Sequence, residues 1–334
     1  MAARMRQPDG YWPHLAALAY GVLGYGAGVA LITAHAPVLN GLGVLVLAHA
    51  LVICAYLVHE CAHNTVFRDN THNARLGQAL NWVTGACYGD YQAIRHKHFR
   101  HHVDRADVVA FDYRPLLARH PRALRVMLAL EWAYIPVLDL LMHALVLVLP
   151  FTLASRSGAR RRVLRAVLVR VALFAAMGVY APKALALYAL AYLLFLHVLR
   201  FMDAFQHTYE LFETLERERG PEAQRFDRDY EHDNTFSNPI SLRHPWLNLL
   251  TLNFGYHNAH HARPTAPWYR LPALHWELYG DDDGQVLPFR NQLRAYHRYR
   301  VARVLNGVDT DIGAGPDRGL AFVGVVGVSF LTAH

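Results

Sequence analysis

Long apolar runs alternate with polar stretches along this chain, and the first two runs form a pair. Residues 15–33 and 38–58 contain no Lys, Arg, Asp or Glu, and each is long enough to cross a bilayer as a helix. Only a short connection that includes His35 and Pro37 separates them. They therefore predict a transmembrane hairpin over residues 15–58 whose two ends lie on the same side of the membrane.

A second pair of apolar runs follows later in the chain. Residues 166–180 and 184–200 are joined at Ala181-Pro182-Lys183, which predicts a second hairpin over residues 166–200. The distribution of apolar residues favours one membrane-embedded body, so we expect a single domain over residues 1–334. The fold class predicted is an all-α integral membrane protein with two transmembrane hairpins, or four spans.

The polar segments after the hairpins indicate the orientation. Residues 59–122 hold nine Lys or Arg residues, so the positive-inside rule places this histidine-rich loop and the N-terminus in the cytosol. Within the loop, residues 76–94 are amphipathic and aromatic, which predicts a helix on the membrane surface. Residues 201–303 are charged and rich in turn formers, and we expect them to form a cytosolic helical cap.

Residues 123–153 are apolar but carry Arg125, Glu131 and Asp139. The next segment, residues 155–165, contains five arginines, and a single crossing before it would place that cluster outside the cell. We therefore expect an interfacial or re-entrant pair of helices that starts and ends on the cytosolic side.

The remaining residues, 304–334, are expected to form a tail. Within it, residues 319–332 are apolar, but about 14 residues is short for a membrane span. This stretch is expected to touch lipid.

Histidines are grouped at three places in the chain. There are 22 in 334 residues, so an HxxHH triplet arises by chance only roughly 0.1 times in such a chain. Two triplets occur here, together with an HxxxH pair, and these spacings place the rings on one face of a helix. Imidazole is a ligand for iron, zinc and copper, and eight rings suit two ions better than one. The candidate ligands are His59, His63, His98, His101, His102, His257, His260 and His261.

An all-histidine ligand set suits oxygen chemistry at two redox-active metals. Neutral imidazoles bind iron without accumulating buried negative charge, and they avoid thiolates, which reactive oxygen would oxidise. The three cysteines show no paired spacing, so a zinc ribbon or a disulfide framework is not indicated. Each ligand should donate from its second ring nitrogen to an acceptor, for which the nearby carboxylates are candidates: Glu60, Asp104, Asp107, Glu210 and Asp233.

The net charge of +7 indicates partners other than nucleic acid. The basic residues flank the apolar runs, so anionic membrane lipids or an acidic electron-donor protein fit them better. The sequence contains no CxxC pair, GxGxxG fingerprint or cytochrome-type haem segment. Electrons for redox chemistry are therefore expected from a separate protein.

The three histidine boxes read HECAH (59–63), HKHFRHH (96–102) and HNAHH (257–261). In order and spacing they resemble those of the membrane fatty acid desaturase superfamily, over roughly residues 15–280. The resemblance implies a four-span protein with a cytosolic cap that holds a histidine-ligated di-iron centre. It also implies O2 as co-substrate and acyl chains or related lipids as substrates.

The stretch RFMDAFQHTYE (200–210) adds to the resemblance. In such desaturases a further ligand histidine follows the fourth span, which His207 matches, and a polar residue four positions earlier can hold a metal-bound water. Asp203 stands there, where the acyl-CoA desaturases more often have Asn, so its role as water holder, direct ligand or partner of a ligand stays open. His96 lies outside the HxxHH unit and is an extra candidate ligand.

Together with the histidine pattern, this resemblance implies an oxidoreductase, an O2-dependent di-iron fatty acyl desaturase. Its substrate would be linked to CoA, a carrier protein or a lipid, and its electron donor would be a ferredoxin-like protein or a haem carrier. A lipid or carotenoid hydroxylase or ketolase of the same superfamily is the alternative, because ligand spacing does not distinguish the two outcomes. A histidine-rich metal transporter is disfavoured, since transporters place ligands inside spans. We expect a multi-pass protein of a bacterial cell membrane with its site on the cytosolic side.

Overall fold

Helices make up nearly all of the regular structure. The computed structural model describes residues 4–215, 226–280, 284–305 and 312–332. These residues divide into two compact units. The first unit lies within Met1–Ile94 and His143–Val198, and the second within Arg95–Met142 and Leu199–Ala333.

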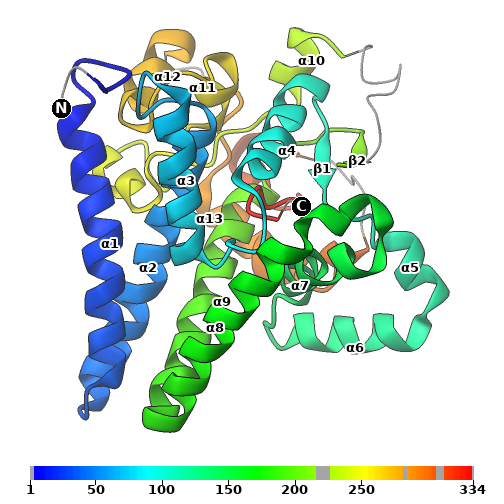
Figure 1. Ribbon diagram of the computed structural model, residues 1–334. Helices are drawn as coiled ribbons and strands as arrows, with labels where there is room; N and C mark the ends of the chain where they lie inside the picture. The colour runs from blue at the N-terminus through cyan, green and yellow to red at the C-terminus, as the bar shows by residue number, and fades with distance from the viewer. Residues whose placement is uncertain (1–3, 216–225, 281–283, 306–311, 333–334) are drawn as a thin grey trace. The chain divides into compact units, whose positions relative to one another are not determined.

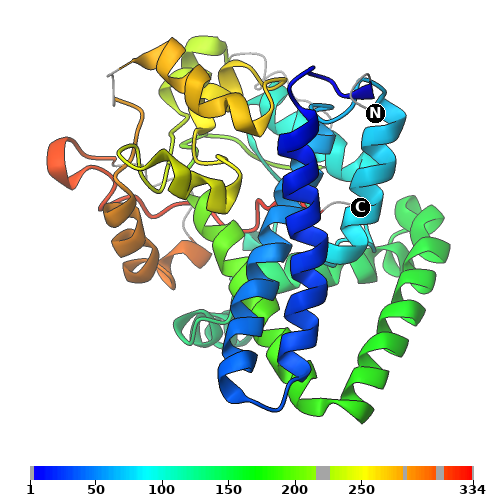
Figure 2. The same cartoon turned by 90° about the vertical axis from the view of Figure 1, so that its left-hand side faces the viewer.

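The first unit contains α1 (Tyr11–Thr33) and α2 (Pro37–Ala62), which run antiparallel and side by side (Figures 1 and 2). The turn between them is closed by Asn40, whose Nδ2 donates to the carbonyl oxygens of Leu31 at 3.0 Å and Ala34 at 2.9 Å. The helices approach closely at Gly28, where a Cβ atom would lie 2.7 Å from Cβ of Leu47. A larger side chain there would force the two helices apart.

The other long apolar helices are α8 (Arg160–Tyr180), which follows a 3-10 turn, η2 (Ala154–Ala159), and α9 (Pro182–Ala204). With α1 and α2 they give four described helices that are long and apolar enough to cross a membrane, as predicted. α8 begins at Arg160 and not at residue 166, so four arginines lie in its first two turns. Long arginine side chains can extend from a helix end toward polar surroundings, which lets the helix start before the apolar run.

The prediction of one helix over residues 76–94 is wrong. The structure has two, α3 (Asn70–Thr84) and α4 (Tyr91–Asp104). α3 ends at Gly85, whose φ of 84° lies in the left-handed region that glycine adopts at helix ends. α4 then starts beside Asp90, whose Oδ1 accepts from the backbone N–H of Gln92 at 2.8 Å.

The second unit is built from short helices and one small parallel sheet. The sheet pairs β1 (Asp107–Val109) with β2 (Phe212–Thr214). Besides the end of α4, the helices are α5 (Arg114–Arg119), α6 (Pro121–Trp132), the start of α7 (Val137–Thr152), the end of α9, α10 (Arg228–Asp233), α11 (His257–Ala262), α12 (Leu271–Tyr279) and α13 (Phe289–Arg298). Short 3-10 turns complete it: η4 (Pro245–Thr251), η5 (Trp268–Arg270), η6 (Ala302–Val304) and η7 (Gly315–Asp317).

The apolar segment 123–153 is broken into two helices, α6 and α7, as predicted. The break follows Trp132, and Tyr134 within it has a φ of 59°. The acidic residues of this segment are buried and face one cation: Arg200 donates to Glu131 at 2.6 Å and 3.0 Å and to Asp139 at 2.5 Å. This ion cluster explains how two carboxylates are tolerated in an apolar segment.

The tail differs from its prediction. Phe322, Val326 and Leu331 are buried in the second unit, so this side of the tail packs against protein instead of lipid. No helix or strand forms over 322–332. Gly324 and Gly327 have φ values of 78° and 81°, which bend the backbone so that its apolar side chains reach the interior.

Candidate metal centre

Two helices of the second unit carry six of the predicted ligands. α4 presents His98, His101 and His102, and α11 presents the HNAHH box. The i, i+3, i+4 spacing places each set on one helix face, as predicted. α11 follows two residues in the left-handed region, Leu252 and Asn253, and all three of its histidines are buried.

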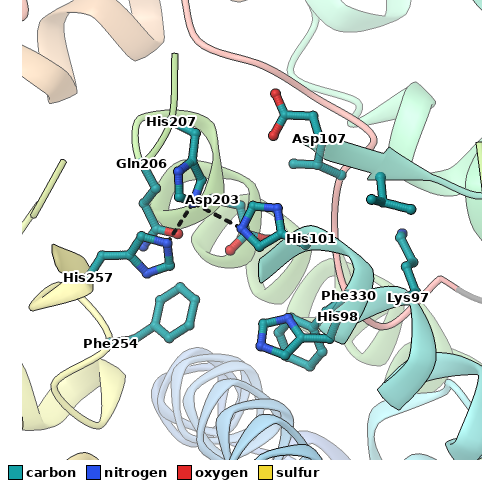
Figure 3. A pocket seen from close by; sticks show the side chains of 12 residues that line it. Lys97, His98, His101, Asp107, Asp203, Gln206, His207, Phe254, His257 and Phe330 are labelled. Atoms are coloured by element: carbon teal, nitrogen blue, oxygen red, sulfur yellow. Dashed lines mark hydrogen bonds between the residues drawn. The ribbon is translucent and has the colours of Figure 1, made fainter. Parts of the chain in front are cut away.

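One histidine group forms around His207, in the loop after α9. Its Nε2 lies 3.0 Å from Nε2 of His101 and 2.8 Å from Nε2 of His257 (Figure 3). His261 completes the group, and one ring nitrogen from each of the four residues lies within 4.8 Å of the others. Four converging imidazoles from three chain segments are an arrangement that could hold a metal ion.

A second histidine group lies beside the first. Nε2 of His102 is 3.2 Å from Nε2 of His98 and 3.2 Å from Nε2 of His260. The rings of His102 and His261 have centroids 4.2 Å apart, which joins the two groups. Seven imidazoles of the second unit therefore form one continuous cluster, large enough for more than one ion.

The outer ring nitrogens show that the cluster fits a cation. Nδ1 of His101 lies 2.8 Å from the carbonyl oxygen of Ala106, and Nδ1 of His261 lies 2.8 Å from Oε1 of Glu231. Both contacts require the proton on Nδ1, which leaves each Nε2 with a lone pair directed inward. Nε2 of His261 is buried and has no hydrogen-bond partner among the described residues. A metal ion would satisfy it, and imidazole donors suit divalent iron.

Burial favours the neutral form of two rings in the cluster, those of His207 and His261. It lowers the pKa of His207 well below its usual value, and His101 lowers that pKa further. The pKa of His261 is also well below its usual value, first through burial and then through His257 and His207. The neutral imidazole is the form that binds a metal, so both residues are ready to act as ligands at neutral pH.

Glu231 was not among the carboxylates singled out from the sequence. It lies on α10 and also forms an ion pair with Arg105, with 3.2 Å between Oε2 and Nε. Burial raises its pKa, an effect that Arg105 opposes. Nothing in the sequence distinguished Glu231 from exposed Asp233 on the same helix, because only packing of α10 against α11 brings Glu231 to His261.

Among the five carboxylates that were singled out, Glu60 lies beside a predicted ligand, with 3.7 Å between its Oε1 and Nδ1 of His59. Asp104 pairs with Arg100 at 2.7 Å, and Oε2 of Glu60 accepts from the hydroxyl of Thr65 at 2.6 Å. Glu210 and Asp233 are exposed. Asp107 alone lines the cavity described below.

The first box lies at the C-terminal end of α2, in the first unit. His59 and His63 are buried, and their ring centroids are 4.8 Å apart. Their contribution to a shared centre remains a prediction from the sequence. His96 is exposed on α4 and belongs to neither histidine group of the second unit.

A cavity of about 50 Å³ opens beside the first histidine group. Its wall combines imidazoles with acidic, basic and apolar side chains (Figure 3): Lys97, His98, His101, Asp107, Val108, Asp203, Gln206, His207, Phe254, His257, Val328 and Phe330. Burial lowers the pKa of Lys97 to about 7, although the charges of Asp203 and Asp139 oppose this shift. Burial also raises the pKa of Asp107 to about 7, although the charge of Arg114 opposes this shift.

Asp203 stands in the wall of this cavity, four residues before His207. Its Oδ2 is buried and has no hydrogen-bond partner among the described residues. A carboxylate oxygen in that position could accept from a water or another group in the cavity.

The family model for fatty acid desaturases matches residues 36–292. That range includes all three histidine boxes and His207. The chain belongs to the fatty acid desaturase family. A comparison of this desaturase-family protein with curated proteins found no match. Its family, together with the four apolar helices found among the described residues, makes it a membrane protein of the oxidoreductase class. The buried tail at 322–332 lies beyond the part of the desaturase pattern that matches.

Proposed function

We propose that this protein is an O2-dependent di-iron desaturase that introduces a C=C bond into a fatty acyl chain. The observation that carries the proposal is the cluster of seven imidazoles in the second unit, in which six Nε2 atoms each lie within 3.2 Å of a neighbouring Nε2 and the seventh, that of His261, is buried without a hydrogen-bond partner among the described residues. The rings of His101 and His261 direct an Nε2 lone pair into this cluster, and burying such a lone pair is unfavourable unless a cation or a donor lies beside it.

The proposed ligands are the eight box histidines and His207. Seven of them are the converging residues of the second unit, and the HECAH box adds His59 and His63 on the strength of its sequence pattern. Two iron ions held there would supply the redox chemistry that activates O2 and removes hydrogen from an unactivated carbon.

The protein's own side chains prepare the site for this reaction. The carbonyl oxygen of Ala106 and the carboxylate of Glu231 hold the rings of His101 and His261 in one orientation. Phe254 and Phe330 give the cavity apolar walls that suit methylene groups. Asp203 presents an oxygen to the same space and is placed to hold a water or a proton there.

The proposed partners follow from the chemistry that the chain lacks. Electrons come from a separate donor, ferredoxin-like or haem-carrying, which docks on a basic cytosolic surface. The acyl group arrives on CoA, on a carrier protein or in a membrane lipid. Eight of the nine proposed ligands lie outside the four described helices that are long enough to span a membrane, and the ninth, His59, lies in the last turn of α2. This supports an enzyme over a metal transporter.

Expression of the full chain in a host of defined lipid composition tests this function. Mass spectrometry of total lipids should show acyl chains that have lost two hydrogens, and the variant His260→Ala should abolish them. A gain of one oxygen would show a hydroxylase instead. Persistence of the new unsaturation in His260→Ala, or its absence with the wild-type chain, would overturn the proposal.

A further inference from the structure

The segment Phe322–Thr332 reaches the candidate metal centre although it lies beyond the matched family pattern. Its sequence, FVGVVGVSFLT, is apolar apart from Ser329 and Thr332. Both of these residues are buried, as are most of its apolar side chains. A segment without helix or strand must find hydrogen-bond partners for its backbone elsewhere when it is buried.

Two contacts fix the path of this segment. At Gly324, a Cβ atom would lie 2.4 Å from the carbonyl oxygen of Ala204 at the end of α9, and that oxygen accepts from the backbone N–H of Val325 at 3.1 Å. Only a glycine permits such an approach with a φ of 78°. The segment is thereby held against the helix end that precedes His207.

Lys97 provides the second attachment. Its Nζ donates to the carbonyl oxygen of Ser329 at 2.7 Å, to that of Thr332 at 2.9 Å and to the hydroxyl of Thr332 at 3.1 Å. An ammonium group has three protons to donate, so this one segment can satisfy all of them. Lys97 is 2% exposed, and burying an ammonium group without such acceptors is costly. Lys97, which is next to ligand candidate His98, therefore holds the segment in place by hydrogen bonds.

Two side chains of the segment line the cavity. Val328 and Phe330 stand in its wall together with His98, His101 and His207, and the ring centroids of Phe330 and His98 are 6.2 Å apart (Figure 3). Ser329 and Leu331 are buried but do not line it. The chain turns at Phe330 and Leu331, where the backbone N–H of Thr332 donates to the carbonyl oxygen of Ser329 at 3.2 Å, and Phe330 is the residue of this turn that lines the cavity.

We propose that Val328 and Phe330 form a specificity wall, against which the reacting stretch of the acyl chain lies, and that Lys97 positions this wall beside the histidines. The inference rests on the proposed function and names residues that select its substrate. An acyl chain offers no polar groups for recognition in its middle, so the shape of the wall must decide which carbon reaches the metal centre. One methylene more or less in an apolar site changes discrimination by roughly 10- to 200-fold.

A photoreactive fatty acid tests the wall without depending on catalysis. Cells that express the full chain are fed a long-chain fatty acid with a mid-chain diazirine, which the host attaches to its own acyl carriers. After irradiation, mass spectrometry should find the label on Val328 or Phe330. Lys97→Met should reduce that labelling several-fold, whereas Leu331→Ala, a matched control in the same segment, should retain it.

Two results would overturn the wall. The label could be absent from residues 322–332, or labelling of other cavity residues could increase in Lys97→Met. The second result would mean that the segment occupies the place of the substrate instead of bordering it. If Lys97→Met does not accumulate as folded protein, a comparison of Phe330→Ala with Leu331→Ala tests the wall instead. Of these two variants, only Phe330→Ala should change the labelled positions.

Product analysis of the same variants separates this inference from the proposed function. With wild-type iron content, Phe330→Ala should change the ratio of products that differ in double-bond position or chain length by about tenfold. An unchanged product ratio would refute the role of Val328 and Phe330 in specificity without contradicting the proposed desaturase activity. Labelling at Val328 or Phe330 without new unsaturation in the wild type or any variant would refute the desaturase activity. It would still support contact between the acyl chain and these two residues.

Discussion

Glu231 accepts a hydrogen bond from Nδ1 of His261 at 2.8 Å, and this contact joins α10 to α11 at the histidine cluster. It fixes the tautomer of His261, so that Nε2 is the nitrogen left to bind a metal. Partners of this kind raise the basicity of a ligand ring and hold its orientation.

Replacement of Glu231 should therefore weaken metal binding. We expect Glu231→Ala to lower the apparent affinity for Fe²⁺ by roughly 10- to 100-fold. Glu231→Gln keeps a side-chain oxygen that can accept from His261, so its affinity for Fe²⁺ should fall less. Anaerobic iron titration of the purified protein measures the effect, with exposed Glu210→Ala as the control. Equal affinities for all four proteins would show that Glu231 does not act on the centre.

His207 should be required for iron binding, whereas His96 should not. Nε2 of His207 contacts Nε2 of both His101 and His257, so its loss removes the centre of one histidine group. His96 is exposed on α4. We expect His207→Ala to lower the iron content of the purified protein by half or more and His96→Ala to leave it unchanged. The reverse pattern would exclude His207 as a ligand.

The buried ion cluster of Arg200 should be important for stability. Arg200→Met would leave the carboxylates of Glu131 and Asp139 buried without their cation, which typically costs about 3–5 kcal/mol of unfolding free energy. Arg263 pairs with Glu277 at 2.9 Å, but both side chains are more than half exposed. Arg263→Met should therefore cost less than about 1 kcal/mol. Thermal unfolding in detergent compares the two, and similar losses of stability would contradict the difference in burial.

Asp107 should make the stability of the protein depend on pH. Burial raises its pKa in the folded state from 3.8 to about 7, so the folded protein binds a proton that the unfolded chain releases. The stabilisation is therefore complete below about pH 4 and is lost as the pH rises through about 7. Asp107→Asn should flatten the dependence of the unfolding temperature on pH between these values. An unchanged slope in Asp107→Asn would assign that dependence to other groups.

The sequence predicted those parts of the molecule that depend on local pattern. The spacing of His98, His101 and His102 placed them on one helix face, and apolar runs without charge predicted α1 and α2. Both conclusions need only the geometry of a single helix.

The features that were missed depend on packing between distant segments. Glu231 reaches His261 only because α10 packs beside α11, and the apolar pattern at 322–332 would fit contact with lipid as well as with protein. The helix expected over 76–94 was broken by Gly85, since glycine readily adopts the left-handed conformation that ends a helix. Periodicity alone could not indicate that break.

A joint measurement of iron and product on one purified sample tests whether the protein is a di-iron desaturase. We expect two iron ions per chain, lowered in His207→Ala and His261→Ala. We also expect an acyl product lighter by two hydrogens that appears only when O2 and a reductant are both supplied. Zinc in place of iron, or product that forms without O2, would refute an O2-dependent di-iron desaturase.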